Sequence, residues 1–354
     1  MKNSIQLGSK TMDIPIIQGG MGVGVSLSKL AGAVMLEGGM GVISAANPGY
    51  AKPNFWQNSI ACNCEALKEE IQKAKAISQG KGICGVNAMV AGNNYETYVK
   101  AAIESGVDAI ISGAGLPMNL PSIEGSEHVL LAPIVSSAKA ARLILKSWDR
   151  HYHRCADFLV IESSEAGGHL GFKKEDLMNG NVQSLEEILS EVLPEVKVYE
   201  DLYKKKIPIF VAGGIYSAQD IVKYQNKGAS GVQIGTRFIA TYECDASDAF
   251  KQKIIEAKKE SVQLVKSPTG FPGRAIVTDF ILKTQETRIP STHCIACMKP
   301  CTPSTTPYCI SEALIKSVQG DVENGLVFAG SNAYRVDKMM SVHDLIQELM
   351  NPTK

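Results

Sequence analysis

The stretch "IPIFVAGGIYSAQD" (residues 207–220) contains a strand, a glycine turn and the start of a helix. Its first part is a near-continuous apolar run, as expected for a parallel strand that is buried on both faces. Gly213 and Gly214 end the run, and Ser217 with Asp220 forms an S-x-x-D capping box for a helix that should end at Gly228. A strand followed directly by a capped helix is the building unit of parallel α/β folds.

Seven further apolar runs repeat this strand pattern, with helical periodicity between most of them. They are residues 14–18, 41–46, 82–90, 108–115, 129–135, 158–163 and 231–235. Eight such units joined by right-handed crossovers predict an α/β fold of the closed (β/α)8 type, a TIM barrel, over residues 1–244. Ser26 is expected to cap the helix after the first strand.

Residues 245–354 depart from the barrel pattern. They should form a small C-terminal lid region, with a helix at about 247–265, a cysteine-rich loop and a closing helix that packs on the barrel. Ser341 and Asp344 form a capping box for that last helix. Since no Gly/Ser or Pro linker separates the two regions, we do not expect the second to fold independently.

Composition narrows the class of partner. Lys plus Arg and Asp plus Glu both total 36 in 354 residues, so the chain has no electrostatic footprint for nucleic acid or an anionic membrane. The N-terminus has no apolar signal region, and no uninterrupted apolar tract is long enough to span a membrane. These features predict a cytoplasmic protein with reduced thiols and a small-molecule partner, and they leave a homo-oligomer open.

Glycine and hydroxyl groups follow the last two predicted strands. Gly213 with Gly214, and Gly235 with Thr236, occupy the loops where a TIM barrel commonly binds phosphate. The alternative is a pair of tight turns without a ligand. Near the start, "QGGMGVG" (18–24) lacks the third glycine and the acidic residue of a dinucleotide fingerprint, so its glycines are better explained as clearance for a flat ring.

Two polar side chains are expected at the same barrel mouth. Asn87 ends the third strand, and its amide can bind a heteroaromatic ring edge or a ribityl hydroxyl, or else bond its own turn. His169 follows Gly167 and Gly168 after the sixth strand. Because imidazole titrates near neutrality, His169 is the candidate for proton transfer, and a structural loop histidine is the alternative.

The motifs "PIIQGGMG", "GVN", "EAGGHLG", "VAGGI" and "GVQIGTRF", in this order, resemble the nitronate monooxygenase family, formerly called 2-nitropropane dioxygenases. The resemblance covers roughly residues 10–280, and the flavin-dependent enoyl-acyl-carrier-protein reductase belongs to the same superfamily. It implies an FMN-dependent TIM barrel that oxidises nitronates or nitroalkanes with molecular oxygen. His169 would be the base, and the residues that would hold FMN are Gly20, Met21, Asn87, Glu162, Gly167, Gly168, Gly213, Gly214, Gln233, Ile234, Gly235 and Thr236.

Glu162 departs from this pattern. Nitronate monooxygenases often have Gln at this position, whereas the related enoyl reductases often have Glu. The sequence therefore leaves open an NAD(P)H-dependent reductase of enoyl thioesters. A third possibility is a flavin or redox sensor without turnover that uses the cysteine-rich loop.

That loop, "HCIACMKPCTPSTTPYC" (293–309), has the spacing C-x2-C-x3-C-x7-C. Thiolates are ligands for zinc and for iron–sulfur clusters, so we predict a metal site at Cys294, Cys297, Cys301 and Cys309. Reduced cysteines without a metal, or one disulfide formed on handling, are the alternatives.

Overall fold

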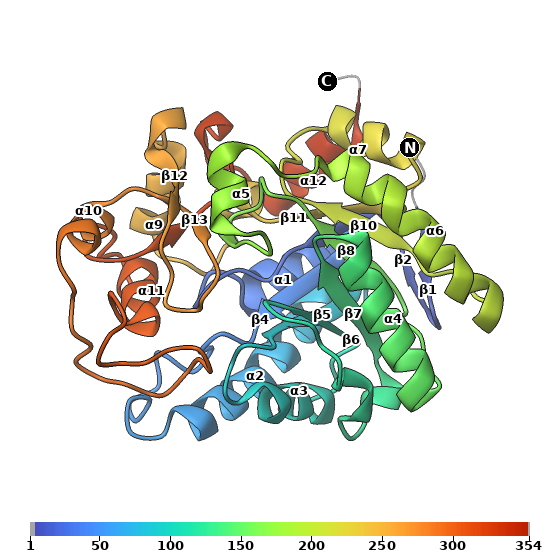
Figure 1. Ribbon diagram of the computed structural model, residues 1–354, viewed down its shortest axis with the longest axis horizontal. Coiled ribbons are helices and arrows are strands. Elements are labelled where there is room, and N and C mark those ends of the chain that lie inside the picture. Colours follow the sequence, from blue (N-terminus) through green and yellow to red (C-terminus); the bar gives the residue numbers. More distant parts are fainter. Residues whose placement is uncertain (1–3, 353–354) are drawn as a thin grey trace.

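The computed structural model describes residues 4–352 and has a closed barrel of eight parallel strands at its centre (Figure 1). The strands, in order around the barrel, are β3 (Ile16–Gln18), β4 (Met40–Ser44), β5 (Ile83–Met89), β6 (Ala109–Gly113), β7 (Leu130–Val135), β8 (Leu159–Glu162), β10 (Ile209–Ala212) and β11 (Gly231–Ile234). β11 pairs with β3 and closes the ring, with Val232 opposite Ile16. The predicted TIM barrel and all eight of its strands are confirmed.

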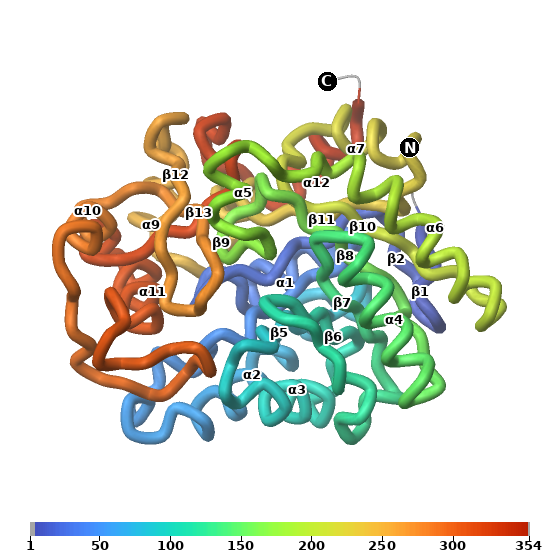
Figure 2. Tube along the Cα trace, viewed as in Figure 1, coloured from blue at the N-terminus to red at the C-terminus, as the bar shows by residue number. Residues whose placement is uncertain are grey.

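Helices surround the barrel. They are α1 (Ser28–Leu36), α2 (Ser59–Ser78), α3 (Tyr95–Glu104), α4 (Ala138–Tyr152), α6 (Leu185–Tyr203), α7 (Ala218–Asn226) and α12 (Val342–Met350). α12 packs against both α1 and α7, where the eighth barrel helix belongs, and Figure 2 shows this red end of the chain beside α7. A helix thus lies where the closing helix is predicted, and the Ser341 hydroxyl accepts from the Asp344 amide at its start. After β6, the 3-10 turns η1 (Leu120–Ser122) and η2 (Ser126–His128) replace a helix.

The expected Ser26 cap of α1 is wrong. The Ser26 hydroxyl accepts instead from the Met21 amide at 2.8 Å. The first turn of α1 is capped by Asp245, whose carboxylate accepts from the amides of Leu27 at 2.7 Å and Leu30 at 3.3 Å. A carboxylate at a helix N-terminus satisfies the unpaired amides and the helix dipole together.

One end of the barrel is closed by an N-terminal hairpin of β1 (Ile5–Leu7) and β2 (Lys10–Met12). Leu7 and Met12 are fully buried and belong to the same core cluster as the inward-facing strand residues Val42 and Ile111. The opening is therefore at the carboxyl ends of the strands. Figure 1 shows the hairpin and the segment coloured orange on opposite sides of the molecule.

That orange segment, residues 262–328, is called here the C-terminal segment. It contains β12 (Val262–Val265), β13 (Gly273–Ile276), α10 (Asp279–Glu286), α11 (Ile310–Val318) and β14 (Val327–Phe328). β13 also pairs with β9 (Gly168–His169), which follows barrel strand β8. The C-terminal segment is thus joined by backbone pairing to the strand that carries His169. The domain boundary after residue 244 lies between α8 (Thr236–Ile239) and α9 (Asp248–Ile255) and stays a prediction.

The helix expected at 247–265 is only half right. α9 ends at Ile255, and residues 262–265 form β12, in which Leu264 pairs with Arg274 of β13. Partners that are near in space but distant in sequence decided this conformation.

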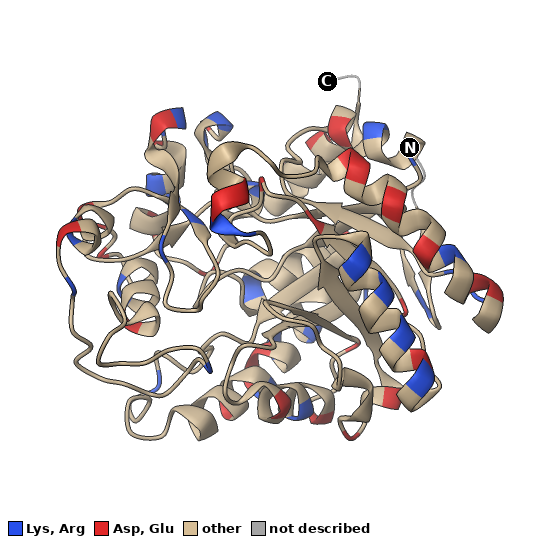
Figure 3. Ribbon diagram, viewed as in Figure 1, with Lys and Arg blue, Asp and Glu red and all other residues tan. Residues whose placement is uncertain are grey.

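Acidic and basic side chains are mixed over the outer helices, as Figure 3 shows. α4 and α6 present side chains of opposite charge to each other, and Arg142 of α4 forms an ion pair with Glu195 of α6. None of the helices within residues 4–352 is both long enough and apolar enough to cross a membrane.

Phe158 and Phe210 fill the barrel interior, with ring centroids 5.7 Å apart in an edge-to-face arrangement. Phe158 is fully buried. We expect Phe158→Ala to lower the free energy of unfolding by about 3–5 kcal/mol, because it leaves a cavity that the strands cannot close. Urea denaturation measures this loss. The control Leu202→Ala removes a side chain that is 58% exposed and should change stability by less than about 0.5 kcal/mol; equal losses in both variants would contradict this view of the core.

Candidate active site

A cavity of about 240 Å³ lies at the carboxyl ends of the barrel strands. Asn87 of β5, Glu162 of β8 and Gln233 of β11 line it from the barrel side. It brings together His169 and every residue predicted to hold the cofactor: Gly20, Met21, Asn87, Glu162, Gly167, Gly168, Gly213, Gly214, Gln233, Ile234, Gly235 and Thr236. The strand-end residues therefore converge as the barrel topology requires.

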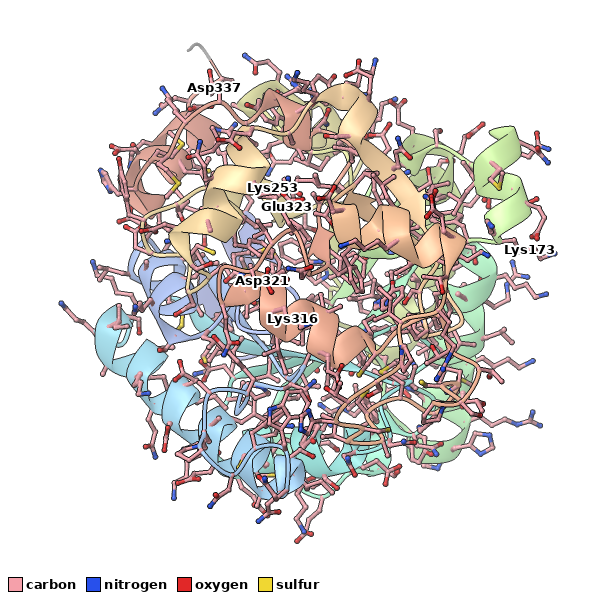
Figure 4. The ribbon with its side chains drawn as sticks, turned by 90° about the vertical axis from the view of Figure 1, so that its left-hand side faces the viewer. Lys173, Lys253, Lys316, Asp321, Glu323 and Asp337 are labelled. Carbon is pink, nitrogen blue, oxygen red and sulfur yellow. The ribbon has the colours of Figure 1, made fainter. Side chains whose placement is uncertain are left out.

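The C-terminal segment and the loop after it provide the opposite wall. Leu314 and Ser317 of α11, with Phe328 of β14, face the same cavity. Figure 4 looks onto this side of the molecule and shows Lys253 and Glu323 together; their ion pair joins α9 to the turn between α11 and β14. The cavity is thus enclosed between the barrel and the C-terminal segment, which this ion pair helps to hold in place.

Glycine is required at the turn after β10 because of what lies against it. Gly213 and Gly214 have φ angles of 87° and 78°, and a Cβ at these positions would collide with Ser163 and with the Glu165 carboxylate, respectively. Since Glu165 is held against Gly214, a phosphate at this turn would require that side chain to move away from the like charge. The predicted glycine turn is present, and it is in contact with an acidic side chain from the loop after β8.

Gly168 differs from those two glycines. Its φ is 77°, and a Cβ there would meet no atom within 4 Å. This part of the cavity wall is bare backbone with clear space beside it, as a flat ring would need.

Two buried polar atoms lack hydrogen-bond partners within residues 4–352, and both belong to residues that line this cavity. They are Gln233 Oε1 and Ser331 Oγ. A buried polar group without a partner costs about 1–3 kcal/mol, so such groups indicate a ligand that completes them. These two side-chain oxygen atoms and the open backbone at Gly168 fit a polar, planar cofactor.

The His169 ring is held by two side-chain contacts. Its Nε2 lies 2.9 Å from Ser267 Oγ, which is 3.0 Å from Thr269 Oγ1. Its ring packs edge-on to Phe328, with centroids 5.1 Å apart. Burial lowers the pKa of His169 to about 4, because the cationic form is deprived of water. The imidazole is therefore neutral at pH 7 and can accept a proton.

The pKa of Glu162 is shifted in the opposite direction from that of His169. Burial raises the pKa of its carboxyl to about 8. At pH 7 the group is mainly protonated, so it can donate a hydrogen bond into the cavity.

The sequence did not identify Arg274, Ser267, Phe328 or Ser331 as site residues. Arg274 donates from Nη1 to the carbonyl of Ala166 at 2.9 Å and also to that of Ser164, and so fixes the loop before His169. Burial lowers the pKa of Arg274, while the nearby Glu165 opposes this shift. The pairing of β13 with β9 and β14 places Arg274 and Phe328 here. The Ser331 amide donates to the Glu165 carbonyl at 3.0 Å, and no local pattern signals these contacts.

The predicted metal site has no counterpart in the described structure. Over residues 4–352, no group of three or more His, Cys, Asp or Glu side chains is arranged to hold a metal ion. Cys294 is exposed, whereas Cys297, Cys301 and Cys309 are partly buried. Cys309 lies at the N-cap of α11.

The raised pKa of Glu162 predicts a pH-dependent stability. Because the folded-state pKa of about 8 exceeds the usual 4.5, the folded state binds more protons, and stability should fall as pH rises between these values. In the ligand-free protein, Glu162→Gln should have the wild-type unfolding midpoint near pH 4.5 and a higher one above pH 8. Thermal unfolding across this range measures the difference. Parallel pH profiles for the two proteins would refute the shift.

Comparison with known proteins gives relatives of two kinds. A dehydrogenase of Mycobacterium tuberculosis, named for (3aS,4S,5R,7aS)-5-hydroxy-7a-methyl-1-oxo-octahydro-1H-indene-4-carboxyl-CoA, is 24% identical over 77% of this chain and 65% of its own length. This chain thus spans less than two thirds of that relative. A protein of Staphylococcus haemolyticus named "Probable nitronate monooxygenase" is 25% identical over 80% of this chain and 81% of its own.

A solved structure and a family model cover more of the chain. FabK from Thermotoga maritima superposes with a TM-score of 0.70 at 25% identity, over 95% of this chain and 91% of that one. The family model described as nitronate monooxygenase matches residues 3–352. The protein therefore belongs to the nitronate monooxygenase family of flavin-dependent oxidoreductases.

Proposed function

We propose that the protein is an FMN-dependent oxidoreductase that oxidises alkyl nitronates and nitroalkanes with molecular oxygen. The observation that carries this proposal is the placement of a neutral His169 on the wall of the cavity that collects the strand-end residues. The family match and the relative from Staphylococcus haemolyticus support the same chemistry.

FMN would be held by the residues that line this cavity. Gln233 Oε1 and Ser331 Oγ are available as partners for its polar groups, and the bare backbone at Gly168 leaves room for its ring. The turns at Gly213–Gly214 and Gly235–Thr236 would receive its phosphate once Glu165 has turned away. When bound, FMN supplies a two-electron acceptor that oxygen can reoxidise.

His169 would accept the α-proton of a nitroalkane. In the tautomer whose Nε2–H donates to Ser267, Nδ1 carries the lone pair that takes the proton. The nitronate formed is an anion, and its charge beside the ring would raise the pKa of His169 toward the usual range, which favours the transfer. The neutral Glu162 would donate a hydrogen bond without adding a competing negative charge.

The second candidate is reduction of an enoyl thioester with NAD(P)H. Glu162, the residue that departs from the monooxygenase pattern, favours it, as does a relative that is named for a CoA thioester. Both candidates use the same cavity, so substrate assays must separate them.

His169→Asn should separate two substrates of the proposed reaction. With a neutral nitroalkane, kcat/KM should fall by about 10²–10⁴, because the proton must be removed by the base. With the preformed nitronate, which has already lost that proton, the loss should be less than about tenfold. The matched control His153→Asn changes an exposed histidine at the end of α4 and should leave both values unchanged. Equal losses on both substrates would argue against His169 as the base.

Anaerobic titration should separate the two candidate functions. Purified protein should be yellow and should release FMN on heat denaturation. We expect a nitronate to bleach the flavin absorbance without oxygen, and NADH and NADPH to leave it intact over the same time. Rapid bleaching by NADH or NADPH would favour the enoyl reductase, and protein that neither contains nor takes up flavin would overturn both.

A further inference from the structure

A second, smaller cavity of about 60 Å³ adjoins the candidate active site. It shares His169, Met89 and Leu314 with the larger cavity, so the two meet at the proposed base. The proposed mechanism uses no other part of it.

The loop between α10 and α11, residues 287–309, forms one wall of this side pocket and is called here the cysteine loop. Ile295, Cys297 and Met298 line the pocket from it. Backbone bonds clamp the loop onto the segment after β5: the Asn93 amide donates to the Cys297 carbonyl at 3.1 Å, and the Lys299 amide donates to the Ala91 carbonyl at 2.9 Å. The motif that suggested a metal thus has a structural role as the wall of a pocket.

Several polar side chains at the side pocket are paired with neighbouring side chains. Asn47 Nδ2 donates to Ser311 Oγ at 3.0 Å, and Asn63 Nδ2 donates to Tyr98 OH at 2.9 Å. The Tyr95 hydroxyl lies 2.8 Å from Ser112 Oγ. These pairs reduce the hydrogen-bonding capacity that the wall offers to a ligand.

Much of the remaining lining is apolar. It includes Ala45, Ala88, Met89, Ile295, Ile310 and Leu314. No Asp, Glu, Lys or Arg of the described chain lines this pocket. Transfer of a hydrocarbon group from water into this pocket carries no desolvation penalty, whereas a charged group would find no partner in it.

We infer that the side pocket binds the aliphatic tail of the substrate and sets its length at about four carbons. A water-sized group needs about 10–15 Å³ of such volume, and at the larger of these values 60 Å³ accepts about four non-hydrogen atoms. The reacting end would lie at His169, where the two cavities meet; in this respect alone the inference rests on the proposed function. A tail in the pocket would press against the cysteine loop.

Straight-chain carboxylates from acetate to heptanoate are suitable probes, because a carboxylate is a planar anion like a nitronate and does not react. With the flavin-loaded protein, calorimetry should show Kd falling about fourfold for each added methylene, up to a tail of about four carbons. Longer tails should bring no further gain. A Kd that is independent of tail length, or one that continues to fall through heptanoate, would overturn the inference.

Two variants should move this limit in opposite directions. Ile310→Phe fills the pocket and should shorten the preferred tail by one or two carbons, whereas Met298→Ala enlarges it and should lengthen the tail by a similar amount. The matched control Ile289→Phe adds the same bulk to the C-terminal core outside the pocket and should leave the limit unchanged. Met298→Ala keeps the test decisive if Ile310→Phe does not fold. An unchanged limit in Met298→Ala would overturn the inference.

Thiol labelling locates the bound tail without any turnover. Pentanoate should slow alkylation of Cys297, which lines the pocket, and leave the exposed Cys294 of the same loop unaffected. If the carboxylates protect Cys297 while no nitroalkane or nitronate is oxidised, the proposed function fails and the side pocket stands. If nitronates are oxidised and Cys297 is not protected, the side pocket fails and the proposed function stands.

Discussion

The pairing of Gly168 and His169 with Arg274 and Gly273 is the interaction on which the candidate site depends. A two-residue strand contributes little by itself, so its position is set by what surrounds it. The Leu170 amide donates to the Pro272 carbonyl at 2.8 Å, and Arg274 holds the preceding loop by its carbonyl groups. The barrel carries His169 to its mouth, and the C-terminal segment fixes the ring there. Neither part alone would define the position of the imidazole.

This arrangement also explains why the two titratable groups of the cavity are both neutral. The same withdrawal from water raises the pKa of Glu162 and lowers that of His169, because each group loses the hydration of its charged form. A pair consisting of a neutral acid and a neutral base suits a carbon acid that becomes an anion only during the reaction. The enclosure by α11 and Phe328 is therefore part of the chemistry as well as of the fold.

The barrel could be predicted from the sequence because each strand is a buried apolar run that ends in small or polar residues, as "IPIFVAGG" shows. Those strand ends also gave the residues of the cavity. Contacts between distant segments could not be predicted. Asp245 caps a helix that begins more than two hundred residues earlier, β12 was expected to be helical, and Ser267 reaches His169 only through β13. In each case the deciding partner is remote in sequence and leaves no local periodicity.

The division between the barrel strands and the segments that contact them from elsewhere in the sequence also bears on substrate choice. The barrel strands carry Asn87, Glu162 and Gln233 to the cavity, and a fold by itself does not specify a reaction. The groups that would discriminate between substrates lie elsewhere: the cysteine loop and α11 wall the side pocket, and the loop after β8 places Glu165 against Gly214. A small nitronate and a long thioester differ mainly in what extends away from the reacting carbon. The walls that meet that extension come from two sources: the barrel with its loops and helices, including Ala88 and Tyr95, and the C-terminal segment, including Ile295 and Ile310. Substrate specificity in this chain should therefore change with either part of the wall, while the barrel fold stays constant.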